Sequence, residues 1–441
     1  MIHMKKIAVI GGGASGLMAA GEAARLGADV TLFEKNEKLG KKLAITGKGR
    51  CNVTNLCPVN EFLSNVATNP KFLYSALNYF TPQNCVDFFG NLGVRLKVER
   101  GKRVFPESDN AFDIVDALKK FVKINHVNVK YENVEKLLVD DDNVGAGSSR
   151  PRIQTEINQG RDDPAPTKIT GLIAGGKKYD FDSVIICTGG ISYPGTGSDG
   201  DGYKFARQAG HNIIDLKPSL VPIEIKEKFC SDLMGLSLKN IKLYVYENDK
   251  KIFEELGEML FTHFGVSGPL VLSASSHIRV GDGVPDVPNY QIKLDLKPGL
   301  TEEQLDKRIL SDFEKYKNKM FKNTLDDLLP KKLIPVFIKI LENDINPEKK
   351  INEITKTERT KLVGLFKNFS LTFKKFRPVD EAIVTCGGID TKEILSNKME
   401  SKLVKGLYFA GEIIDVDAYT GGFNLQIAFA TGKLAGKNAA L

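Results

Sequence analysis

The stretch that decides the fold is KIAVIGGGASG at residues 6–16. Its first five residues form a β-branched apolar run, which is typical of a buried parallel strand. The glycine-rich part matches G-x-G-x-x-G at Gly11, Gly13 and Gly16. In a dinucleotide-binding unit the first glycine permits a tight turn and the second lets a pyrophosphate approach the backbone. The third lets the following helix pack closely on the strand.

The residues after the glycines have the pattern that such a unit needs. Residues 17–26 are rich in alanine and predict a helix, whose N-terminus would stabilise phosphates. Residues 28–33 predict a second strand, and Glu34 follows it, where a carboxylate can accept a hydrogen bond from a ribose hydroxyl. The order of these features is a strand, the glycines, a helix, a second strand and an acidic residue. This order predicts dinucleotide binding rather than a purely structural glycine turn.

The C-terminal region indicates which dinucleotide is bound. Residues 406–412, GLYFAGE, predict a short strand that ends in a glycine and an acid. Residues 420–424, TGGFN, then precede an apolar helical segment at 425–435. The free N–H groups and the positive dipole end of such a helix can stabilise negative charge on the N1–C2=O side of a reduced flavin. A nicotinamide dehydrogenase needs no such element, so this region indicates FAD.

A third segment supports a flavoprotein. Residues 183–187, SVIIC, predict a strand that leads into Thr188, Gly189 and Gly190. This turn is similar to the A-T-G turn of two-dinucleotide-fold flavoproteins. Because G-x-G-x-x-G occurs once, any nicotinamide cofactor must dock directly at the flavin.

Composition sets the broad class of the protein. The chain has 441 residues, of which 42% are apolar and 27% charged, and this predicts two or three globular domains. The net charge of +7 permits an anionic partner without requiring one. No apolar run reaches the ~18 residues that span a bilayer, and the N-terminus lacks the pattern of a signal peptide. We therefore expect a cytoplasmic protein with no membrane partner.

Cysteine and histidine usage argues against a metal centre. The six cysteines include no C-x-x-C pair, and the five histidines are scattered along the chain. This usage predicts reduced thiols and no metal site. Asp199 and Asp201 are interpreted as turn residues rather than as metal ligands.

Several longer motifs extend over most of the chain. They are GKKLAITGKGRCNVTN at 40–55, KRVFPES at 102–108, TGGISYPGTGSDGDGY at 188–203, GEMLFTHFGVSGP at 257–269, TCGGI at 385–389 and GEIIDVDAYTGGFNLQIAFATG at 411–432. With them, the chain resembles the bacterial YhiN-like flavoprotein family, also called bile-acid-inducible-type or aminoacetone-oxidase-like, from residue 5 to the C-terminus. The resemblance implies one tightly bound FAD.

The resemblance also implies an α/β fold, with a discontinuous FAD-binding Rossmann domain of the two-dinucleotide type, a β-barrel-like domain and an inserted helical domain. The expected boundaries are 1–217 for the first part of the FAD domain with a flexible loop at 140–168, 218–299 for the barrel, 300–366 for the helical insert, 367–390 for the return through the barrel domain, and 391–441 for the closing part of the FAD domain.

Local patterns support this division. Residues 239–246 and 290–296 alternate as strands do. Thr301 with Gln304 predicts a capping box, and so does the acidic version formed by Thr324 and Asp327. The segment 328–341 predicts a packed helix that Pro330 and Pro335 would shorten or kink.

The motifs and the resemblance together predict the residues that hold FAD. Lys42, Arg50 and Asn52 could alternatively be ordinary surface side chains. The full predicted set is Gly11, Gly13, Ala14, Ser15, Gly16, Glu34, Lys35, Lys42, Thr46, Gly49, Arg50, Cys51, Asn52, Thr188, Gly189, Gly411, Glu412, Asp417, Gly422, Phe423, Asn424 and Leu425.

Two side chains are candidate catalytic groups. Cys51 could donate a proton beside the flavin, with Arg50 and Lys48 lowering the pKa of its thiol, or it could be a packing residue. His263 could act as a general acid or be a hydrogen-bonded structural histidine. Glu258 is a further candidate acid.

Candidate substrate contacts lie in two basic runs, at 95–103 and 361–378. Arg103 and Phe105 could clamp an anionic or planar substrate, or simply belong to a strand. The second run carries Lys374 and Lys375 and interleaves lysines with Phe366, Phe369, Phe373 and Phe376. Such a run can hold a phosphate backbone and stack bases, although its phenylalanines could equally be core residues and its lysines solvated.

The resemblance implies NAD(P)H-dependent reduction of a uridine in large-subunit ribosomal RNA to dihydrouridine, since some family members resemble such synthases. NAD(P)H would be a transient electron donor. The alternatives are a small-molecule flavoenzyme, which oxidises an amine or aminoketone or reduces an unsaturated ketone, and a flavin-containing RNA-binding module without catalytic activity.

Overall fold

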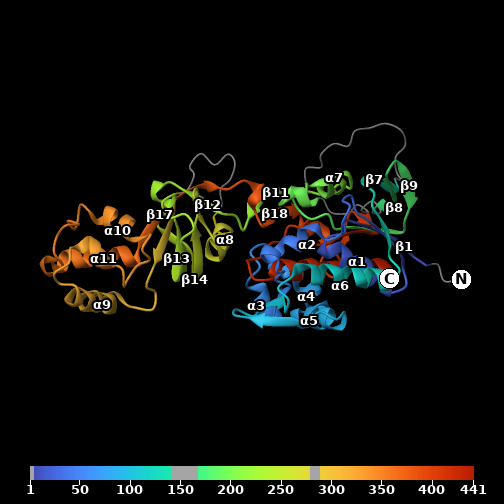
Figure 1. Cartoon of the computed structure of the whole chain (residues 1–441). Helices are drawn as coiled ribbons and strands as arrows, with labels where there is room; N and C mark the ends of the chain where they lie inside the picture. Colours follow the sequence, from blue (N-terminus) through green and yellow to red (C-terminus); the bar gives the residue numbers. More distant parts are fainter. Residues whose placement is uncertain (1–3, 141–166, 279–288) are drawn as a thin grey trace, which may run out of the picture. The chain divides into compact units, whose positions relative to one another are not determined.

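The computed structural model describes residues 4–140, 167–278 and 289–441, so the predicted loop at 140–168 lies almost wholly outside the described residues. The strands on either side of it, β7 (Val134–Asp140) and β8 (Thr167–Ala174), pair antiparallel. The chain divides into two compact units, residues 1–218 with 383–441, and residues 219–382 (Figure 1).

The first unit is built on a seven-stranded sheet in which five consecutive strands are parallel. In spatial order the strands are β19 (Ile394–Leu395), β20 (Glu400–Ser401), β22 (Leu407–Phe409), β10 (Ser183–Ile186), β1 (Lys6–Ile10), β2 (Asp29–Phe33) and β6 (Asn128–Lys130). The predicted strands at 6–10, 28–33 and 183–187 are therefore all present. β1 and β10 are buried along almost their whole length, which explains why they have no polar alternation.

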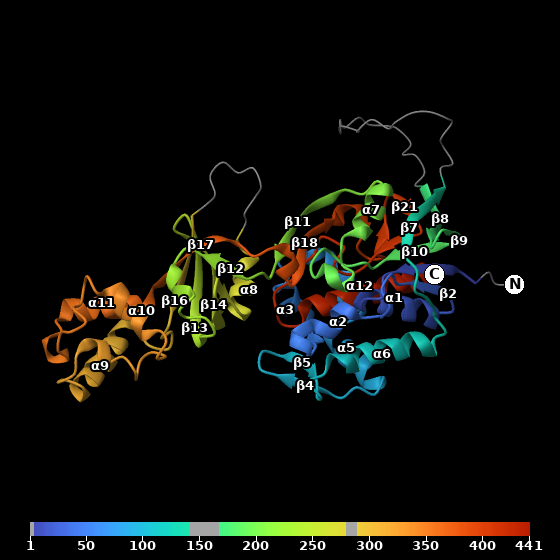
Figure 2. The ribbon, with the colours of Figure 1, turned by 45° about the horizontal axis from the view of Figure 1, so that its top comes forward.

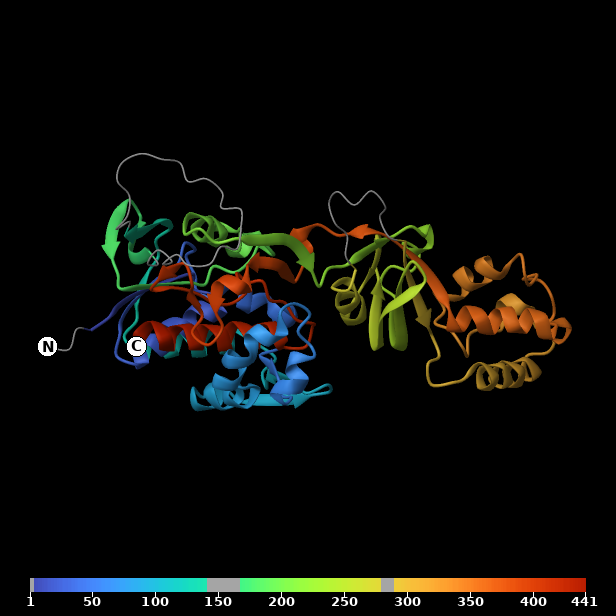
Figure 3. The same cartoon turned by 180° about the vertical axis from the view of Figure 1, so that it is seen from behind.

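Two helices cross this sheet in close contact. They are α1 (Ala14–Arg25) and α12 (Phe423–Ala440), and Figures 2 and 3 show α12 running beside α1. A Cβ on Gly432 would lie 2.3 Å from the carbonyl oxygen of Ser15, and a Cβ on Gly436 would lie 2.3 Å from that of Ala19. The two glycines of α12 therefore allow the helix backbones to approach.

Smaller elements complete the first unit. Its other helices are α2 (Lys41–Ile45), α3 (Val59–Leu63), α4 (Tyr74–Tyr79), α5 (Pro82–Asn91), α6 (Ala111–Ile124) and α7 (Asp201–Gln208). Its other strands form a small sheet of β3 (Thr54–Asn55), β5 (Arg103–Pro106) and β4 (Leu96–Glu99), a pair of β11 (Ile213–Ser219) and β18 (Val384–Ile389), and a sheet of β21 (Val404–Lys405), β8, β7 and β9 (Lys177–Asp180). Since β18 pairs with β11, residues 383–390 belong with the first unit.

The second unit contains a closed six-stranded barrel. Its strands, in spatial order, are β12 (Ile223–Ile225), β15 (Gly265–Ser267), β14 (Lys250–Phe261), β13 (Ser237–Glu247), β16 (Tyr290–Asp295) and β17 (Phe369–Phe376). The strands predicted at 239–246 and 290–296 are β13 and β16. Alternate residues of β13, among them Ile241, Leu243 and Val245, are buried in the barrel core.

Helices α8 (Pro269–Ser275), α9 (Glu302–Lys315), α10 (Ile334–Leu341) and α11 (Lys356–Lys367) also belong to this unit. α9 begins with the predicted capping box of Thr301 and Gln304. α10 begins only at Ile334, so the prolines do shorten the predicted helix. The second capping box is wrong, because no helix begins at Thr324, whose hydroxyl donates to the carbonyl of Phe321 at 2.8 Å. The nearby Pro330 disfavours a helix in the residues before it.

Within the described residues, no helix combines the length and the apolar character needed to cross a lipid bilayer.

Candidate flavin-binding site

The turn between β1 and α1 has the geometry that a pyrophosphate needs. The N-cap residue Gly13 provides no side-chain cap, and the first helical bond runs from Leu17 N to Gly13 O at 3.0 Å. The N–H groups before Leu17 are therefore available to an anion. Gly11 has φ +99°, and a Cβ on Gly16 would lie 1.8 Å from the carbonyl oxygen of Gly11. A Cβ on Gly13 would meet no atom within 4 Å, so this backbone faces open space.

Glu34 is buried directly beside this turn. Its carboxylate accepts hydrogen bonds from the backbone N–H of Gly12 at 2.8 Å and from the backbone and side chain of Asn36 at 2.8 and 2.6 Å. The neighbouring Lys35 bonds Asp199 at 2.6 Å and Asp201 at 3.0 Å. In the described residues no three acidic, histidine or cysteine side chains gather as metal ligands, and these two aspartates pair with a lysine instead.

The start of α12 is a second helix terminus without a side-chain cap. Its N-cap residue Gly422 has φ +97°, and a Cβ there would lie 2.5 Å from the backbone of Thr54. The Asn424 side chain closes the preceding loop, since it accepts from Ala418 N at 3.0 Å and donates to Ala418 O at 2.6 Å. The first N–H groups of α12 and its positive dipole end therefore remain available to a partly negative ligand.

Buried oxygen atoms without a hydrogen-bond partner lie at the same elements. Among the described residues they include Asn52 Oδ1, Thr54 Oγ1 and Thr188 Oγ1. Asn52 Oδ1 lies 2.8 Å from where a Cβ of Gly422 would be, and Thr188 lies two residues after the end of β10. Buried polar atoms in proteins are normally satisfied, so these atoms call for a polar ligand. Together with the two uncapped helix ends, they fit FAD.

A network of hydrogen bonds joins three distant motifs beside these elements. Lys42 Nζ donates to Ser192 Oγ at 2.7 Å and to Glu412 Oε2 at 2.6 Å. Glu412 Oε1 accepts from Ser192 Oγ at 2.9 Å and from the backbone N–H of Thr385 at 2.9 Å. Sequence reasoning named Lys42 and Glu412 but missed Ser192 and Thr385, although both lie inside the motifs at 188–203 and 385–389.

Cys51 does not have the environment predicted for it. Its side chain is fully buried, and burial raises the pKa of its thiol to about 12. The prediction that Arg50 and Lys48 lower this pKa is therefore wrong. The charge of Arg50 is directed elsewhere, because its guanidinium bonds Glu99 at 2.5 Å and Asp109 at 2.7 Å. A thiol with a raised pKa stays protonated at neutral pH.

The ring of Phe105 is already covered from within the protein. Phe105 is 4% exposed, and the Arg50 guanidinium lies 4.2 Å from its ring centroid. Arg103 donates from Nε to the carbonyl of Arg100 at 3.0 Å. This arrangement favours the structural alternative, in which Arg103 and Phe105 belong to an ordinary strand of a small sheet.

The other two candidate acids belong to the second unit. His263 is exposed in the turn between β14 and β15, and its ring contacts that of Phe264 edge-on at 4.9 Å. Glu258 is exposed on β14. The candidate catalytic residues named from the sequence are thus divided between the two units.

Three of the four phenylalanines in the second basic run are not available for stacking. Phe366, Phe369 and Phe373 are at most 6% exposed and belong to the core of the second unit, so the prediction that they stack bases is wrong. These side chains face inward because α11 and β17 each bury one face in the hydrophobic core of the second unit. By contrast, the side chains of Lys374 and Lys375 are 56% and 63% exposed, each 3.6 Å from Glu224.

The first basic run is largely neutralised by acids that lie outside it. Lys97 bonds Asp109 at 2.8 Å, and Lys102 bonds Glu61 at 2.7 Å. Surface pairs of this kind leave little net positive field for a polyanion.

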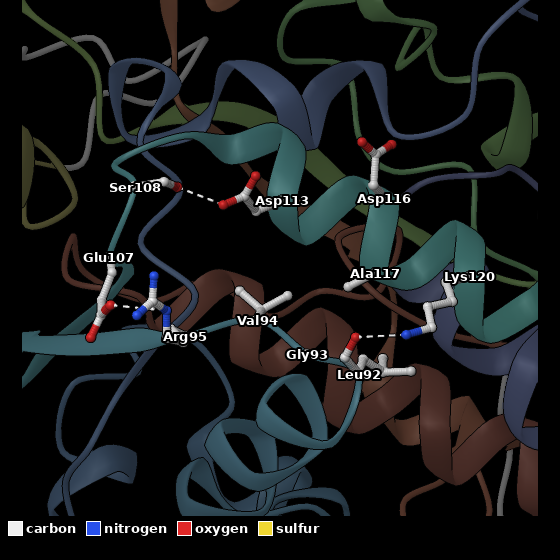
Figure 4. A pocket seen from close by; sticks show the side chains of 10 residues that line it. All are labelled: Leu92, Gly93, Val94, Arg95, Glu107, Ser108, Asp113, Asp116, Ala117 and Lys120. Atoms are coloured by element: carbon white, nitrogen blue, oxygen red, sulfur yellow. Dashed lines mark hydrogen bonds and ion pairs between the residues drawn. The ribbon is translucent and has the colours of Figure 1, made fainter.

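A polar cavity of about 440 Å³ lies between the start of this run and α6 (Figure 4). In it Arg95 pairs with Glu107 at 3.3 Å, and Ser108 donates to Asp113 at 2.6 Å. Lys120 donates to the carbonyl of Leu92 at 3.1 Å. The residues that line the cavity include none of the predicted flavin contacts.

Comparisons with known proteins agree with this site. Residues 5–438 match the family described as HI0933-like protein Rossmann domain. The chain is 30% identical over 441 residues to the 3-dehydro-bile acid delta(4,6)-reductase of Clostridium scindens, covering 99% of both chains. It is 31% identical over 430 residues to the ribosomal RNA dihydrouridine synthase of Haemophilus influenzae, covering 96% of this chain and 95% of the relative.

The same level of similarity extends to the ribosomal RNA dihydrouridine synthase of Escherichia coli, at 30% identity over 425 residues, with 96% and 95% coverage. Among solved structures, the open conformation of a flavocytochrome c3 fumarate reductase has a TM-score of 0.50 at 15% identity, and the match covers all of this chain and 78% of that one. This likeness concerns the fold. The chain belongs to the HI0933-like Rossmann family and is an FAD-dependent oxidoreductase.

Proposed function

We propose that this enzyme reduces a uridine in large-subunit ribosomal RNA to dihydrouridine, with NAD(P)H as the source of electrons. The observation that carries the proposal is the pair of relatives named ribosomal RNA dihydrouridine synthase, which match this chain at 31% and 30% identity over about 95% of their own length. The net charge of +7 is compatible with a polyanionic substrate.

The chemistry of this reduction matches what the chain offers. FAD, when bound and reduced, would supply a hydride for C6 of the uracil ring, whose C5=C6 bond is conjugated with the C4 carbonyl, and this chain would then have to provide a proton at C5. The start of α12 would stabilise negative charge on the N1–C2=O side of the flavin, and the α1 turn would hold the pyrophosphate. Glu34 accepts from a ribose hydroxyl when it exchanges one of its present N–H partners for that group.

Two side chains are candidate proton donors to C5. The Cys51 thiol stays protonated at neutral pH because its pKa is raised, but its burial limits direct contact with a nucleotide. His263 is exposed, and an imidazole can serve as a general acid. A His263→Gln variant distinguishes between Cys51 and His263 as the proton donor. If the variant loses dihydrouridine formation while NAD(P)H still reduces its FAD normally, His263 is the donor.

The deciding experiment is mass spectrometry of nucleosides from large-subunit ribosomal RNA. We expect one dihydrouridine to disappear in cells that lack the gene and to return when the gene is restored. An unchanged dihydrouridine content in the deletion strain would refute the proposed function.

A second candidate is supported by one observation. The bile-acid relative, at 30% identity over 99% of both chains, is named as a reductase of double bonds conjugated to a 3-oxo group. Both reactions reduce a C=C bond conjugated with a carbonyl, so one flavin site can serve either. Turnover of a 3-oxo-4,6-diene steroid by the purified protein, without any change in ribosomal RNA, would favour the small-molecule reductase.

A further inference from the structure

Four neighbouring strands of the barrel, β14, β13, β16 and β17, have a polar and aromatic outer face; Figure 2 shows them side by side. On β13 the core residues Leu243 and Val245 are fully buried. Lys242, Tyr244 and Tyr246 alternate with them and remain partly exposed on the opposite side. The strand thus carries a lysine and two tyrosines at every second position on its outer surface.

The strand register extends this pattern across the sheet in two rows. Each row has one tyrosine from β13, one residue of β14 on one side, and residues of β16 and β17 on the other. The first row is Glu254, Tyr244, Lys293 and Ser370, and the second row is Lys251, Tyr246, Gln291 and Thr372. We call these eight residues, with Lys242, the tyrosine face.

The geometry of the tyrosine face brings cations to aromatic rings. The ring centroids of Tyr244 and Tyr246 are 6.5 Å apart and tilted by 41°. Lys293 Nζ lies 4.7 Å from the Tyr246 centroid, while Lys242 and Lys251 lie 5.4 and 5.8 Å from that of Tyr244. Three ammonium groups therefore surround two rings.

The charge on this face is positive. Glu254 is the acid of the two rows, and it pairs with Lys242 at 3.1 Å and also with Lys251. Lys293 has its contact with a ring instead of a carboxylate. Lys374 follows Ser370 and Thr372 at the next outward position of β17 and adds a further exposed cation.

We propose that the tyrosine face is the docking surface for a single-stranded segment of RNA. Tyrosine rings offer a stacking surface that accepts any base, and lysines beside them meet the phosphates. Small antiparallel barrels and sheets bind single-stranded nucleic acid on such outer faces, with aromatic side chains stacking two or three bases. The hydroxyl and amide groups of Ser370, Thr372 and Gln291 can bond base edges or 2′-hydroxyls. The inference rests on the proposed function, because it specifies how that RNA substrate is held.

The direct test is RNA binding by the FAD-loaded, full-length protein. The probe is a fluorescein-labelled oligouridylate of about 16 nucleotides, the upper range of a single barrel site, followed by fluorescence anisotropy. Tyr244→Ala and Tyr246→Ala should each weaken binding about 5- to 100-fold, and Tyr→Phe at either position should retain it, because the ring is what stacks. Tyr74→Ala and Tyr131→Ala are matched controls, since both tyrosines are 57% exposed in the first unit.

Lysine variants test the electrostatic part of the site. Lys293→Gln should lower the dependence of log Kd on log salt by about 0.7, as expected when one phosphate contact to a single strand is lost. Lys339→Gln, on α10 in the same unit, is the control and should leave the salt dependence unchanged.

The outcomes separate this inference from the proposed function. The double variant Tyr244→Ala/Tyr246→Ala should keep its FAD and fail to restore dihydrouridine in the deletion strain. If the wild type restores dihydrouridine and the double variant restores and binds RNA equally well, the tyrosine face is refuted and the function stands. If the wild type does not restore dihydrouridine, the proposed function is refuted. In that case the tyrosine face is still supported if the wild type binds the oligouridylate and the double variant does not. If the two proteins bind the oligouridylate equally, the tyrosine face is refuted as well.

Discussion

At the residue scale, two glycines of one motif have different physical tasks. Gly16 cannot accept a side chain, because a Cβ would overlap the carbonyl oxygen of Gly11. Gly13 has an ordinary extended backbone with φ −84° and open space around its Cβ position. The motif therefore contains one glycine required for packing and another that is required only when a ligand is bound.

Gly13→Val should therefore give a folded protein that has lost FAD. The valine side chain would occupy the space through which a pyrophosphate approaches the backbone, while no protein atom opposes it. The measurement is the ratio of flavin absorbance to protein absorbance after purification, together with the far-ultraviolet circular dichroism spectrum.

Gly90→Ala is the matched control, since Gly90 is also in open space but lies on α5, remote in sequence from the motif. The control should retain its yellow colour. A Gly13→Val protein with a full complement of FAD would show that the pyrophosphate lies elsewhere.

The environment of the Cys51 thiol could not be predicted from its neighbours in the chain. Arg50 and Lys48 are neighbours in the chain, and from spacing alone they are expected to stabilise a thiolate. The fold instead buries the thiol and directs Arg50 toward Glu99 and Asp109. Burial of the thiolate then dominates, and the pKa moves in the opposite direction.

At the element scale, a buried histidine joins the start of β11 to the β19–β20 hairpin. His211 Nε2 lies 2.8 Å from Ser401 Oγ, and Nδ1 lies 3.1 Å from Glu393 Oε2. Ser401 Oγ already accepts from the N–H groups of Leu403 and Val404, so its own hydrogen points to Nε2. The arrangement therefore requires a neutral imidazole with its proton on Nδ1.

The buried His211 and its hydrogen bonds should make the protein less stable in mild acid. Burial lowers the pKa of His211, and Glu393 opposes the shift without cancelling it. Since the pKa is lower in the folded than in the unfolded state, the unfolded chain binds the proton more readily. The stabilising contribution is complete above the unfolded pKa of about 6.5 and is lost as the pH falls toward the folded pKa.

The measurement is the thermal midpoint between about pH 7 and about pH 5, the range in which histidine titrates. His211→Gln should lower the midpoint at neutral pH and remove part of its decline in acid. His126→Asn, at an exposed position with φ +59°, should change neither. If the thermal midpoint depended on pH in the same way for the wild type and for His211→Gln, the proposed role of His211 would be contradicted.

A second element-scale contact ties α11 to β16. Lys367 Nζ bonds Asp295 at 2.6 Å and the carbonyls of Lys297 and Leu300 at 3.1 and 2.7 Å, with both charged side chains nearly buried. Lys367 belongs to the basic run that the sequence offers as an RNA contact. In the fold it is a structural residue.

Lys367→Met should lower the free energy of unfolding by about 3–5 kcal/mol, because it leaves a buried carboxylate without its partner. Urea unfolding measures the change. The double variant Asp295→Asn/Lys367→Met should recover part of the loss, since no buried charge then remains unpaired. If the two variants are equally destabilised, the ion pair is not the cause.

At the scale of the whole molecule, the flavin-binding elements belong to the first unit and the exposed cations of β17 belong to the second. Lys374→Glu/Lys375→Glu should therefore weaken reduction of ribosomal RNA and leave the reduction of FAD by NAD(P)H unchanged. The reversed charges repel phosphates, and Glu224 nearby adds to the repulsion.

Stopped-flow measurement of flavin reduction and quantification of dihydrouridine test the two steps separately. The double variant Lys331→Glu/Lys339→Glu, at exposed positions elsewhere in the second unit, controls for the change in net charge. Equal loss in both steps would place the effect of the lysine variants on the flavin instead of on RNA docking.

The sequence by itself determined the nucleotide-binding half of this protein. The strand at 6–10, the glycine turn, Glu34 and the uncapped helix after Gly422 are local features, because their geometry depends on residues a few positions apart. A short motif therefore contains most of the information that specifies them.

Only the tertiary structure decided which charged and aromatic side chains are free to meet a substrate. Phe369 and Lys367 look available in the chain but are engaged in the core, while Tyr244 and Tyr246 have no basic run beside them and yet are brought together with lysines of β14 and β16. Lys367 pairs with Asp295 and Tyr246 contacts Lys293, in each case across more than 40 residues of the chain, so strand register and burial, which arise from long-range packing, decide the outcome.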